Sequence, residues 1–133
     1  NSRRRMTMLI GVGCDVIEIA RVAKALERRA FVERVYAPEE IAYCESRGKQ
    51  AAASFAARFA AKEAVLKALG TGLRGGELTE IIVLNDALGK PSVQLSGYHA
   101  ELAAKLGVKN IALSMSHSRA TALAYEVMEG DKE

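Results

Sequence analysis

Hydrophobic and polar positions follow first a strand pattern and then a helical pattern near the start of the chain. Residues 8–17 are mostly apolar and β-branched, which predicts a buried strand. By alternation, Gly11, Gly13 and Asp15 share one face of that strand, so this face is open to a closely approaching group. Residues 18–29 have apolar side chains at helical spacing and predict an amphipathic helix.

The rest of the pattern predicts further helices and antiparallel strands. A short helix is expected to begin at Pro38, because a proline suits the first helical turn, and to end at Gly48. A long helix of about residues 50–69 is expected to stop at Gly70. The remaining elements are a hairpin, a short helix and a closing antiparallel pair, at residues 80–86 with 91–96, 99–107, and 111–117 with 120–128. This order of elements predicts an α+β fold.

Residues 55–70 combine a very apolar helix with four charged side chains. On a helical wheel the bulky side chains fall on one side and the alanines on the opposite side. Alanine permits close approach of another backbone, so the helix is expected to be buried on two faces. Glu63 and Lys67 lie at one seam between these faces, and Arg58 lies at the other. Lys62 falls among the bulky side chains.

Two interpretations of Glu63 and Asp15 are open at this point. Glu63 could pair with Lys67, a surface interaction worth roughly 0.2–0.5 kcal/mol, or it could bind a cation, because an unpaired buried charge is costly. Asp15 could cap the helix that begins near Glu18, or it could share a cation with Glu63. Two carboxylates, with waters and substrate phosphates, suit Mg²⁺. Arg58 and Lys67 suit the phosphate oxygens.

Composition and charge narrow the class of function. The 133 residues suit a single domain, and the formal net charge of +3 with a pI of about 9.0 points to an acidic partner or a phosphate-rich ligand. The chain has three phenylalanines, four tyrosines and no tryptophan, none of them interleaved with a basic stripe, so nucleic acid is disfavoured as a partner. No apolar run approaches the ~20 residues that span a bilayer, so no membrane partner is expected.

The cysteines and the N-terminus bear on location. Cys14 and Cys44 match no disulfide framework and no metal-ligand spacing, so we expect reduced thiols and a cytoplasmic protein. Residues 1–7 are basic and lack the apolar core of a signal peptide. We interpret them as an N-terminal extension that is partly an addition to the natural protein, and residues 8–133 as the one domain.

Four segments together carry a resemblance to a known family. In chain order they read GVGCDVIEIARV, FAARFAAKEAVLKALGTG, GKP and SMSHS, and they begin at Gly11, Phe55, Gly89 and Ser114. The first two are highly specific in combination, whereas the last alone is a weak signal. With this order and spacing, the chain resembles the holo-[acyl-carrier-protein] synthases, the small bacterial type of 4′-phosphopantetheinyl transferase, over about residues 8–128.

This resemblance implies a fold, an assembly and an activity. The implied fold is the 4′-phosphopantetheinyl transferase fold, an antiparallel sheet packed with a long central helix. The implied assembly is a homotrimer whose active sites lie between subunits. The implied reaction moves the 4′-phosphopantetheine group from coenzyme A to a serine of apo acyl carrier protein and releases adenosine 3′,5′-bisphosphate. It depends on Mg²⁺ and supports fatty acid biosynthesis.

The resemblance also implies roles for individual residues. Asp15 and Glu63 resemble the family's Mg²⁺ ligands and, with Lys62, are the expected catalytic residues. Arg21 resembles part of the surface that docks the acidic carrier protein. The residues that resemble the family's coenzyme A contacts are Arg58, Lys67, Gly89, Lys90, Pro91, His117 and Ser118.

Some roles have two readings within this prediction. The proton of the serine hydroxyl goes either to Glu63 or to a metal-bound water that Glu63 orients. Lys62 either steadies the leaving phosphate or extends its amine past the core to water. His117 is either a structural residue of a turn or a phosphate contact, and His99 is interpreted as a helix-surface residue.

Two rival functions have less support. A trimeric binding module that docks a carrier protein without transfer would be expected to lack one of the two carboxylates, and both are present. Another Mg²⁺-dependent phosphotransferase acting on nucleotides would be expected to carry a GxxxxGK[ST] motif, which this sequence lacks. Carrier proteins of fatty-acid and of polyketide type are both candidate acceptors.

Overall fold

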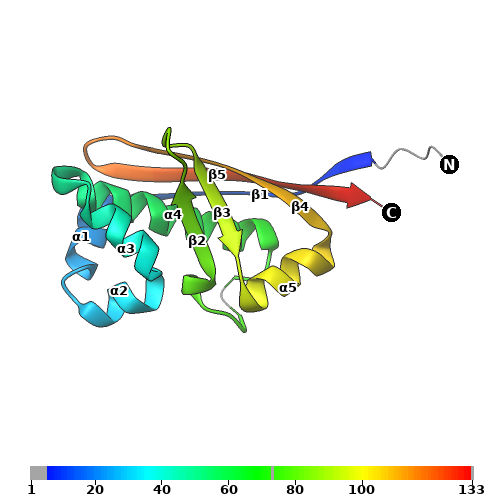
Figure 1. The fold of residues 1–133 in the computed structure, drawn as a ribbon, viewed down its shortest axis with the longest axis horizontal. Coiled ribbons are helices and arrows are strands. Elements are labelled where there is room, and N and C mark those ends of the chain that lie inside the picture. The colour runs from blue at the N-terminus through cyan, green and yellow to red at the C-terminus, as the bar shows by residue number, and fades with distance from the viewer. Residues whose placement is uncertain (1–5, 73, 133) are drawn as a thin grey trace.

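One antiparallel sheet forms a side of the molecule (Figure 1). The computed structural model describes residues 6–72 and 74–132, and the basic segment at 1–5 lies outside these residues. The sheet has three strands in the order β1–β5–β4: β1 (Met6–Glu18), β4 (Val108–His117) and β5 (Thr121–Lys132). The predicted first strand and closing pair are thus confirmed. All three strands are longer than predicted, because β5 pairs with both neighbours along nearly its whole length.

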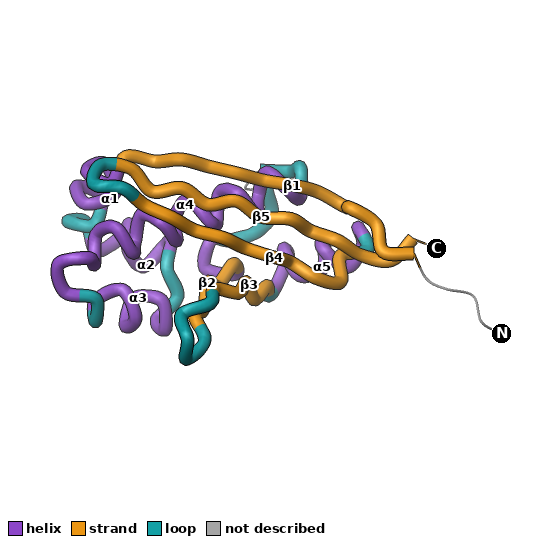
Figure 2. Tube along the Cα trace, turned by 90° about the horizontal axis from the view of Figure 1, so that it is seen from above, coloured by secondary structure: helices purple, strands orange, loops and turns teal. Residues whose placement is uncertain are grey.

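The long helix α4 (Ala51–Leu69) packs directly against the inner face of this sheet (Figure 2). The contact is very close, because a Cβ built on Gly13 would overlap the carbonyl oxygen of Ala64. Glycine in the strand and alanine in the helix therefore let the two backbones approach, as the sequence predicts. The alanines on both sides of this contact are fully buried: Ala60, Ala61, Ala64 and Ala124.

The helical segment between β1 and α4 differs from the prediction. The expected helix over residues 18–29 ends early as α1 (Ile19–Ala25), and a second helix, α2 (Arg29–Val35), was not predicted. The break lets Val32 and Val35 reach the core around Phe55. Neither helix start has a side-chain cap, so the sequence carries no local signal of the break. The helix at Pro38 is confirmed as α3 (Pro38–Glu45), and a 3₁₀ turn, η1 (Gly48–Gln50), leads into α4.

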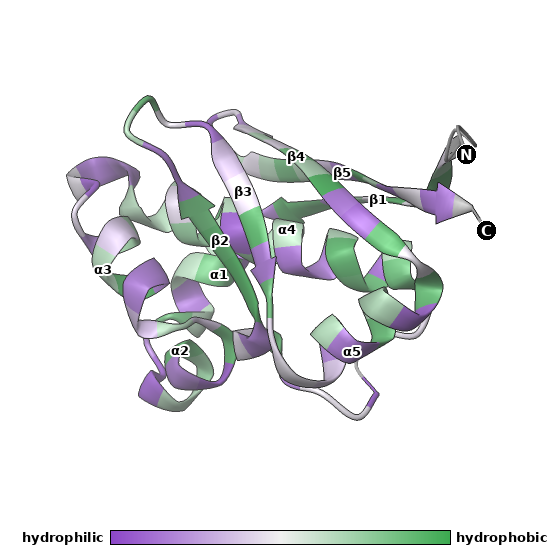
Figure 3. Ribbon diagram, turned by 45° about the vertical axis from the view of Figure 1, so that its right-hand side comes forward, coloured by the Kyte–Doolittle hydropathy of each residue, from purple (hydrophilic) through white to green (hydrophobic). Residues whose placement is uncertain are grey.

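A two-stranded hairpin covers another side of α4. It consists of β2 (Ile81–Asn85) and β3 (Pro91–Leu95), and it follows a 3₁₀ turn, η2 (Leu78–Glu80). Figure 3 colours β2 largely hydrophobic, and Ile81 and Val83 are buried there against α4 residues such as Val65 and Ala61. The two-sided burial of α4 predicted from its helical wheel is therefore confirmed.

The last helix, α5 (Gly97–Leu106), corrects one prediction. His99 is fully buried and does not lie on the helix surface. Its Nδ1 lies 2.9 Å from Glu80 Oε1, and a Cβ built on Gly76 would overlap its ring. The loop that covers His99 comes from more than twenty residues earlier in the chain, so helical periodicity alone does not reveal the burial.

The outer face of the sheet carries large apolar side chains exposed to solvent. The exposed fractions are 65% for Leu9, 50% for Val12, 66% for Val16, 44% for Leu123 and 49% for Tyr125. Side chains alternate along β1 and β5, and the register shift between Leu9 and Gly11 moves this alternation by one residue, so Leu9 points away from α4 as the other four do. In the described part of the chain, no helix combines the length and the apolar character needed to cross a bilayer.

Candidate active site

Asp15 and Glu63 face one another across the contact between β1 and α4. Asp15 follows Gly13 on the inner face of β1, and Glu63 lies one turn before Lys67 on α4. The Lys67 ammonium donates to Asp15 Oδ1 at 3.1 Å and to the Cys14 carbonyl oxygen at 3.0 Å. The predicted seam of α4 therefore does bring the carboxylates and a cation together.

One of the two interpretations of each carboxylate is not formed in this geometry. Asp15 pairs with Lys67. The N-cap residue of α1 is Glu18, and no side chain makes a capping hydrogen bond at this end of the helix. Among the described residues, Lys67 makes its ion pair with Asp15 and none with Glu63. The helix cap at Asp15 and the surface pair at Glu63 are thus not formed.

The Glu63 carboxyl has an environment that favours a bound cation. Burial raises its pKa, the nearby Asp15 carboxylate raises it further, and Lys67 acts in the opposite direction. Glu63 lines a cavity of about 380 Å³ together with Leu66, Lys67, Gly70 and Gly72. Within the described residues, no group of three or more His, Cys, Asp or Glu could hold a metal by itself. Glu63 at an open cavity, with the Asp15 carboxylate close to it, fits a Mg²⁺ ion that takes its other ligands from water and substrate.

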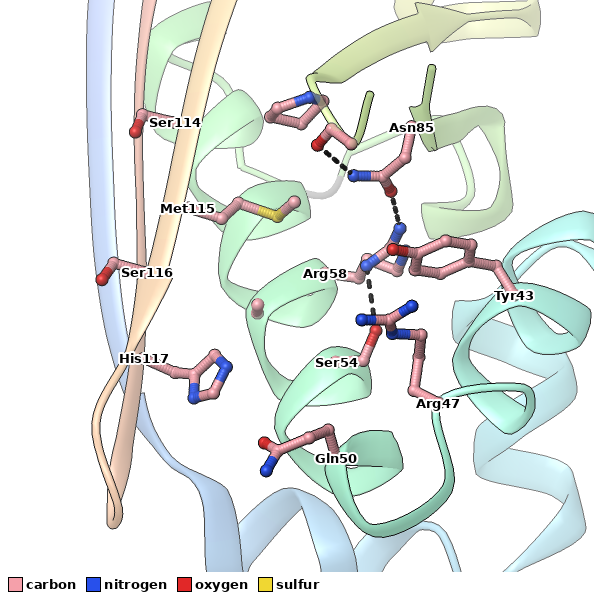
Figure 4. A pocket seen from close by; sticks show the side chains of 13 residues that line it. Tyr43, Arg47, Gln50, Ser54, Arg58, Asn85, Ser114, Met115, Ser116 and His117 are labelled. Carbon is pink, nitrogen blue, oxygen red and sulfur yellow. Dashed lines mark hydrogen bonds between the residues drawn. The ribbon is translucent and has the colours of Figure 1, made fainter. Parts of the chain in front are cut away.

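A second cavity, of about 390 Å³, lies between α3, α4, β4 and the β2–β3 hairpin (Figure 4). Arg58, Gly89, Pro91 and His117 all line it, so four of the predicted coenzyme A contacts converge here. In Figure 4, His117 and Met115 point from β4 toward α4, whereas Ser114 and Ser116 point away.

Arg58 lines this cavity, and its side chain is almost fully buried, with 3% exposed. Several contacts fix its position. One guanidinium nitrogen donates to Ser54 Oγ at 3.1 Å, and another donates to Asn85 Oδ1. The guanidinium also stacks over the Tyr43 ring, 4.4 Å from its centre. Its Nε is buried and has no hydrogen-bond partner among the described residues.

The other predicted contacts lie nearby. Ser118 lies in the β4–β5 turn, where its hydroxyl is 3.0 Å from Thr121 Oγ1, and it lines a neighbouring cavity with His117 and Arg119. Lys90 is exposed, and its backbone N–H donates to Asp86 Oδ1 at 2.9 Å. Lys67 belongs instead to the cavity of Glu63.

Most of the chain is similar to proteins of one known superfamily. Residues 11–124 match the model of the 4′-phosphopantetheinyl transferase superfamily. The chain belongs to this superfamily. The chain is 49% identical to a holo-[acyl-carrier-protein] synthase of Ruminiclostridium cellulolyticum, over 92% of both chains. It is 46% identical to one of Clostridium tetani, over 93% of this chain and 98% of that one.

Solved structures agree with this assignment. The acyl carrier protein synthase of Plasmodium yoelii with ADP bound superposes with a TM-score of 0.85 at 33% identity, over 96% of this chain and 99% of that one. The Bacillus anthracis holo-(acyl-carrier-protein) synthase in complex with CoA (3′,5′-ADP) superposes with a TM-score of 0.77 at 35% identity. The match covers 92% of this chain and 98% of that one. The predicted fold, and the prediction that the chain is a phosphopantetheinyl transferase, are confirmed.

Lys62 of this phosphopantetheinyl transferase is enclosed in the core. Its ammonium is fully buried and donates to Glu40 Oε1 at 2.7 Å, to the Leu78 carbonyl oxygen at 3.1 Å and to the Ile81 carbonyl oxygen. The amine therefore does not extend past the core to water, which corrects one of its two predicted roles. It also faces neither of the two cavities just described.

Arg21 is exposed on α1, where it lines a shallow groove with Lys24 and Arg28. Sequence reasoning did not single out Tyr43, Asn85 or their contacts with Arg58. Asn85 gives a weak signal, since asparagine is uncommon in strands. Tyr43 gives none, because only the tertiary fold brings α3 beside α4.

Proposed function

We propose that this chain transfers the 4′-phosphopantetheine group from coenzyme A to a serine of apo acyl carrier protein. The observation that carries the proposal is the proximity of the Asp15 carboxylate to Glu63, which lines a cavity. The relatives named holo-[acyl-carrier-protein] synthase and the CoA complex of the Bacillus anthracis protein support the choice of donor and acceptor.

Asp15 and Glu63 are the residues that would hold Mg²⁺. The metal would neutralise charge on the diphosphate and on the departing 3′,5′-bisphosphate. Lys67, now paired with Asp15, is 57% exposed at its side chain and can turn to a phosphate oxygen when a cation takes its place. Glu63 lies where it can accept the proton of the serine hydroxyl, directly or through an ordered water.

The second cavity suits the nucleotide part of coenzyme A. Arg58 supplies a guanidinium held by Ser54 and Asn85, and His117 and Arg47 add polar groups around the same space. Gly89 has a φ of +89°, a conformation that glycine adopts readily. Gly89 and Pro91 both line the cavity. A phosphate and a planar base both fit such a lining.

The site is proposed to be completed between subunits of a homotrimer. The metal pair and the nucleotide cavity have separate linings within one chain. The exposed apolar face of the sheet, with Leu9, Val16 and Tyr125, offers a surface that a second copy would cover. A neighbouring copy could thus bring its nucleotide cavity to the metal pair.

The carrier protein is proposed to dock on α1. Arg21, Lys24 and Arg28 form a basic surface there, and it suits an acidic partner through electrostatic steering. A role in fatty acid biosynthesis and a cytoplasmic location belong to the same proposal.

The test of this function is a mass measurement. The chain is incubated with apo acyl carrier protein, coenzyme A and Mg²⁺, and the carrier protein is weighed. One phosphopantetheine should be added per carrier molecule, with release of 3′,5′-ADP, and chelation of the metal should stop the reaction. No added mass with several bacterial carrier proteins, in the presence of the folded chain, contradicts the proposal.

A further inference from the structure

Lys62 and Glu40 form a fully buried ion pair whose members lie on different helices. Lys62 is 0% exposed and Glu40 is 1% exposed. Burial lowers the pKa of the Lys62 ammonium, and the Glu40 carboxylate counteracts this shift. Three acceptors surround the ammonium, so each of its three N–H groups has a partner and none is free for a ligand.

Glu40 extends the same network to the backbone. Its Oε1 accepts from the Ala37 N–H at 2.9 Å as well as from Lys62, and its Oε2 accepts from the Val83 N–H at 2.9 Å. The pair therefore joins α3 and α4 to η2 and β2. Both members of the pair are hydrogen-bonded to the backbone of β2. Lys62 donates to the Ile81 carbonyl oxygen, and Glu40 accepts from the Val83 N–H.

β2, the strand bound by this ion pair, ends at Asn85, which lines the nucleotide cavity. Ile81, Val83 and Asn85 alternate on β2, and Asn85 accepts a hydrogen bond from Arg58. The Asn85 amide also donates to the Gly89 carbonyl oxygen at 2.9 Å and so holds the β2–β3 turn. Arg58 lies one turn before Lys62 on α4, so two neighbouring positions of the helix hold two positions of the strand.

We propose that Lys62 and Glu40 are positioning residues that fix β2 on α4 and thereby place Asn85 and the 86–90 turn around Arg58. They act on coenzyme A through Asn85 and Arg58 and touch no reacting atom. The proposal rests on the proposed function, because it assigns the cavity of Arg58 to the nucleotide of coenzyme A.

The test compares two single variants with the double variant. Lys62→Met and Glu40→Gln each leave a lone or poorly matched group in the core, so each should lower Tm by roughly 10 °C. Each should also raise the Kd for 3′,5′-ADP by about tenfold, because Asn85 loses its fixed place. The double variant leaves no lone buried charge and should recover most of the loss in Tm, but its Kd for 3′,5′-ADP should stay raised, because the Lys62 bond to the Ile81 carbonyl oxygen is still absent. The exposed pair Arg29–Glu33 supplies the control, and Glu33→Gln should change neither quantity.

A chemical role for Lys62 predicts a different result. If its ammonium touched the reacting phosphate, turnover in the double variant would fall with no change in the affinity for 3′,5′-ADP. A double variant with the Tm and 3′,5′-ADP affinity of the wild type, but with turnover more than about 100-fold lower, overturns the proposal.

Asn85→Ala keeps the proposal testable if the single variants do not fold. It should raise the KM for coenzyme A and the Kd for 3′,5′-ADP by about tenfold while Tm changes little, because the buried pair is intact. Unchanged affinity in this variant also overturns the proposal. A wild type that binds 3′,5′-ADP without transferring phosphopantetheine contradicts the proposed function alone, and 3′,5′-ADP affinity still measures the effect of the ion pair.

Discussion

Three carboxyl groups of this transferase differ because their surroundings differ. Glu40 is buried with the Lys62 ammonium and two backbone N–H groups. Glu63 is half-buried beside a second carboxylate, Asp15, at an open cavity. Glu126 is fully buried, and neither of its oxygens has a hydrogen-bond partner among the described residues. The first group stabilises the fold through an ion pair, the second suits a metal, and burial favours the neutral acid form of the third.

The metal pair predicts a change in Mg²⁺ dependence. Asp15→Asn and Glu63→Gln keep the shape of each side chain and remove the charge that a hard cation needs. Each should lower turnover by roughly 100-fold or more and raise the Mg²⁺ concentration for half-maximal rate, with Tm near that of the wild type. The double variant should lose little more than the worse single variant, because the two act as one site. A near-wild-type rate at limiting Mg²⁺ would show that the carboxylates do not share a metal.

Glu126 predicts a stability that falls as pH rises. Burial raises the pKa of its carboxyl from 4.5 to about 8, so the folded chain keeps a proton that the unfolded chain releases. The stabilising contribution is complete below about pH 4.5 and is lost as pH rises through about 8, with a slope of at most ~1.4 kcal/mol per pH unit. Urea unfolding of the wild type and of Glu126→Gln, from pH 5 to pH 9, measures this slope.

The two unfolding curves should differ by an amount that depends on pH. The free energy of unfolding of Glu126→Gln should rise relative to wild type between pH 5 and pH 8 and then level off. Glu129→Gln, an exposed change on the same strand, should leave the pH dependence unaltered. A constant difference across the range would mean that Glu126 does not titrate in the folded chain.

At the scale of elements, the contact between β1 and α4 connects the fold to the site. Gly13 lets the strand approach the helix at Ala64, and Asp15 and Glu63 lie next to that contact. The separation between the two carboxylates is thus set by a packing contact between backbones. A change that forces β1 away from α4 should disturb both stability and metal binding.

Gly13→Ala tests this connection. The new Cβ would overlap backbone, which cannot rotate away, so the strand must move. Tm should fall by roughly 10 °C, and the Mg²⁺ concentration for half-maximal rate should rise. Thr7→Ala, an exposed change on the same strand, is the matched control. An unchanged Tm would show that this contact does not set the distance between the strand and the helix.

The hydrophobic patterns of the sequence predicted β1 and α4, the elements that carry Asp15 and Glu63. The features that these patterns missed depend on contacts between residues far apart in the chain. Alternation along β1 and the helical wheel of α4 predicted that Asp15 and Glu63 lie on facing sides, because both periods are fixed by backbone geometry. The Glu40–Lys62 pair joins residues 22 positions apart, and its partners on β2 lie still further along the chain. No period in the sequence encodes such a contact.

At the scale of the whole molecule, both faces of the sheet are apolar but only one is covered. The inner residues of β5 are buried against α4, whereas Leu123 and Tyr125 are exposed. A trimer would cover this outer face, and light scattering should then give a mass about three times 14.3 kDa. A monodisperse and active monomer would exclude sites shared between subunits.

The central claim is that each active site joins the metal pair of one copy to the nucleotide cavity of another. It is tested most directly by co-expressing two inactive variants, Glu63→Gln and Arg58→Met, with separate affinity tags, after each has been shown to form a trimer alone. In random mixed trimers a site is intact when one copy supplies Asp15 and Glu63 and its neighbour supplies Arg58. Every doubly tagged trimer contains both variants, so one of its three sites, about one third, should be intact, and these trimers should recover phosphopantetheine transfer to that extent. Mixed trimers as inactive as either variant alone would contradict the claim.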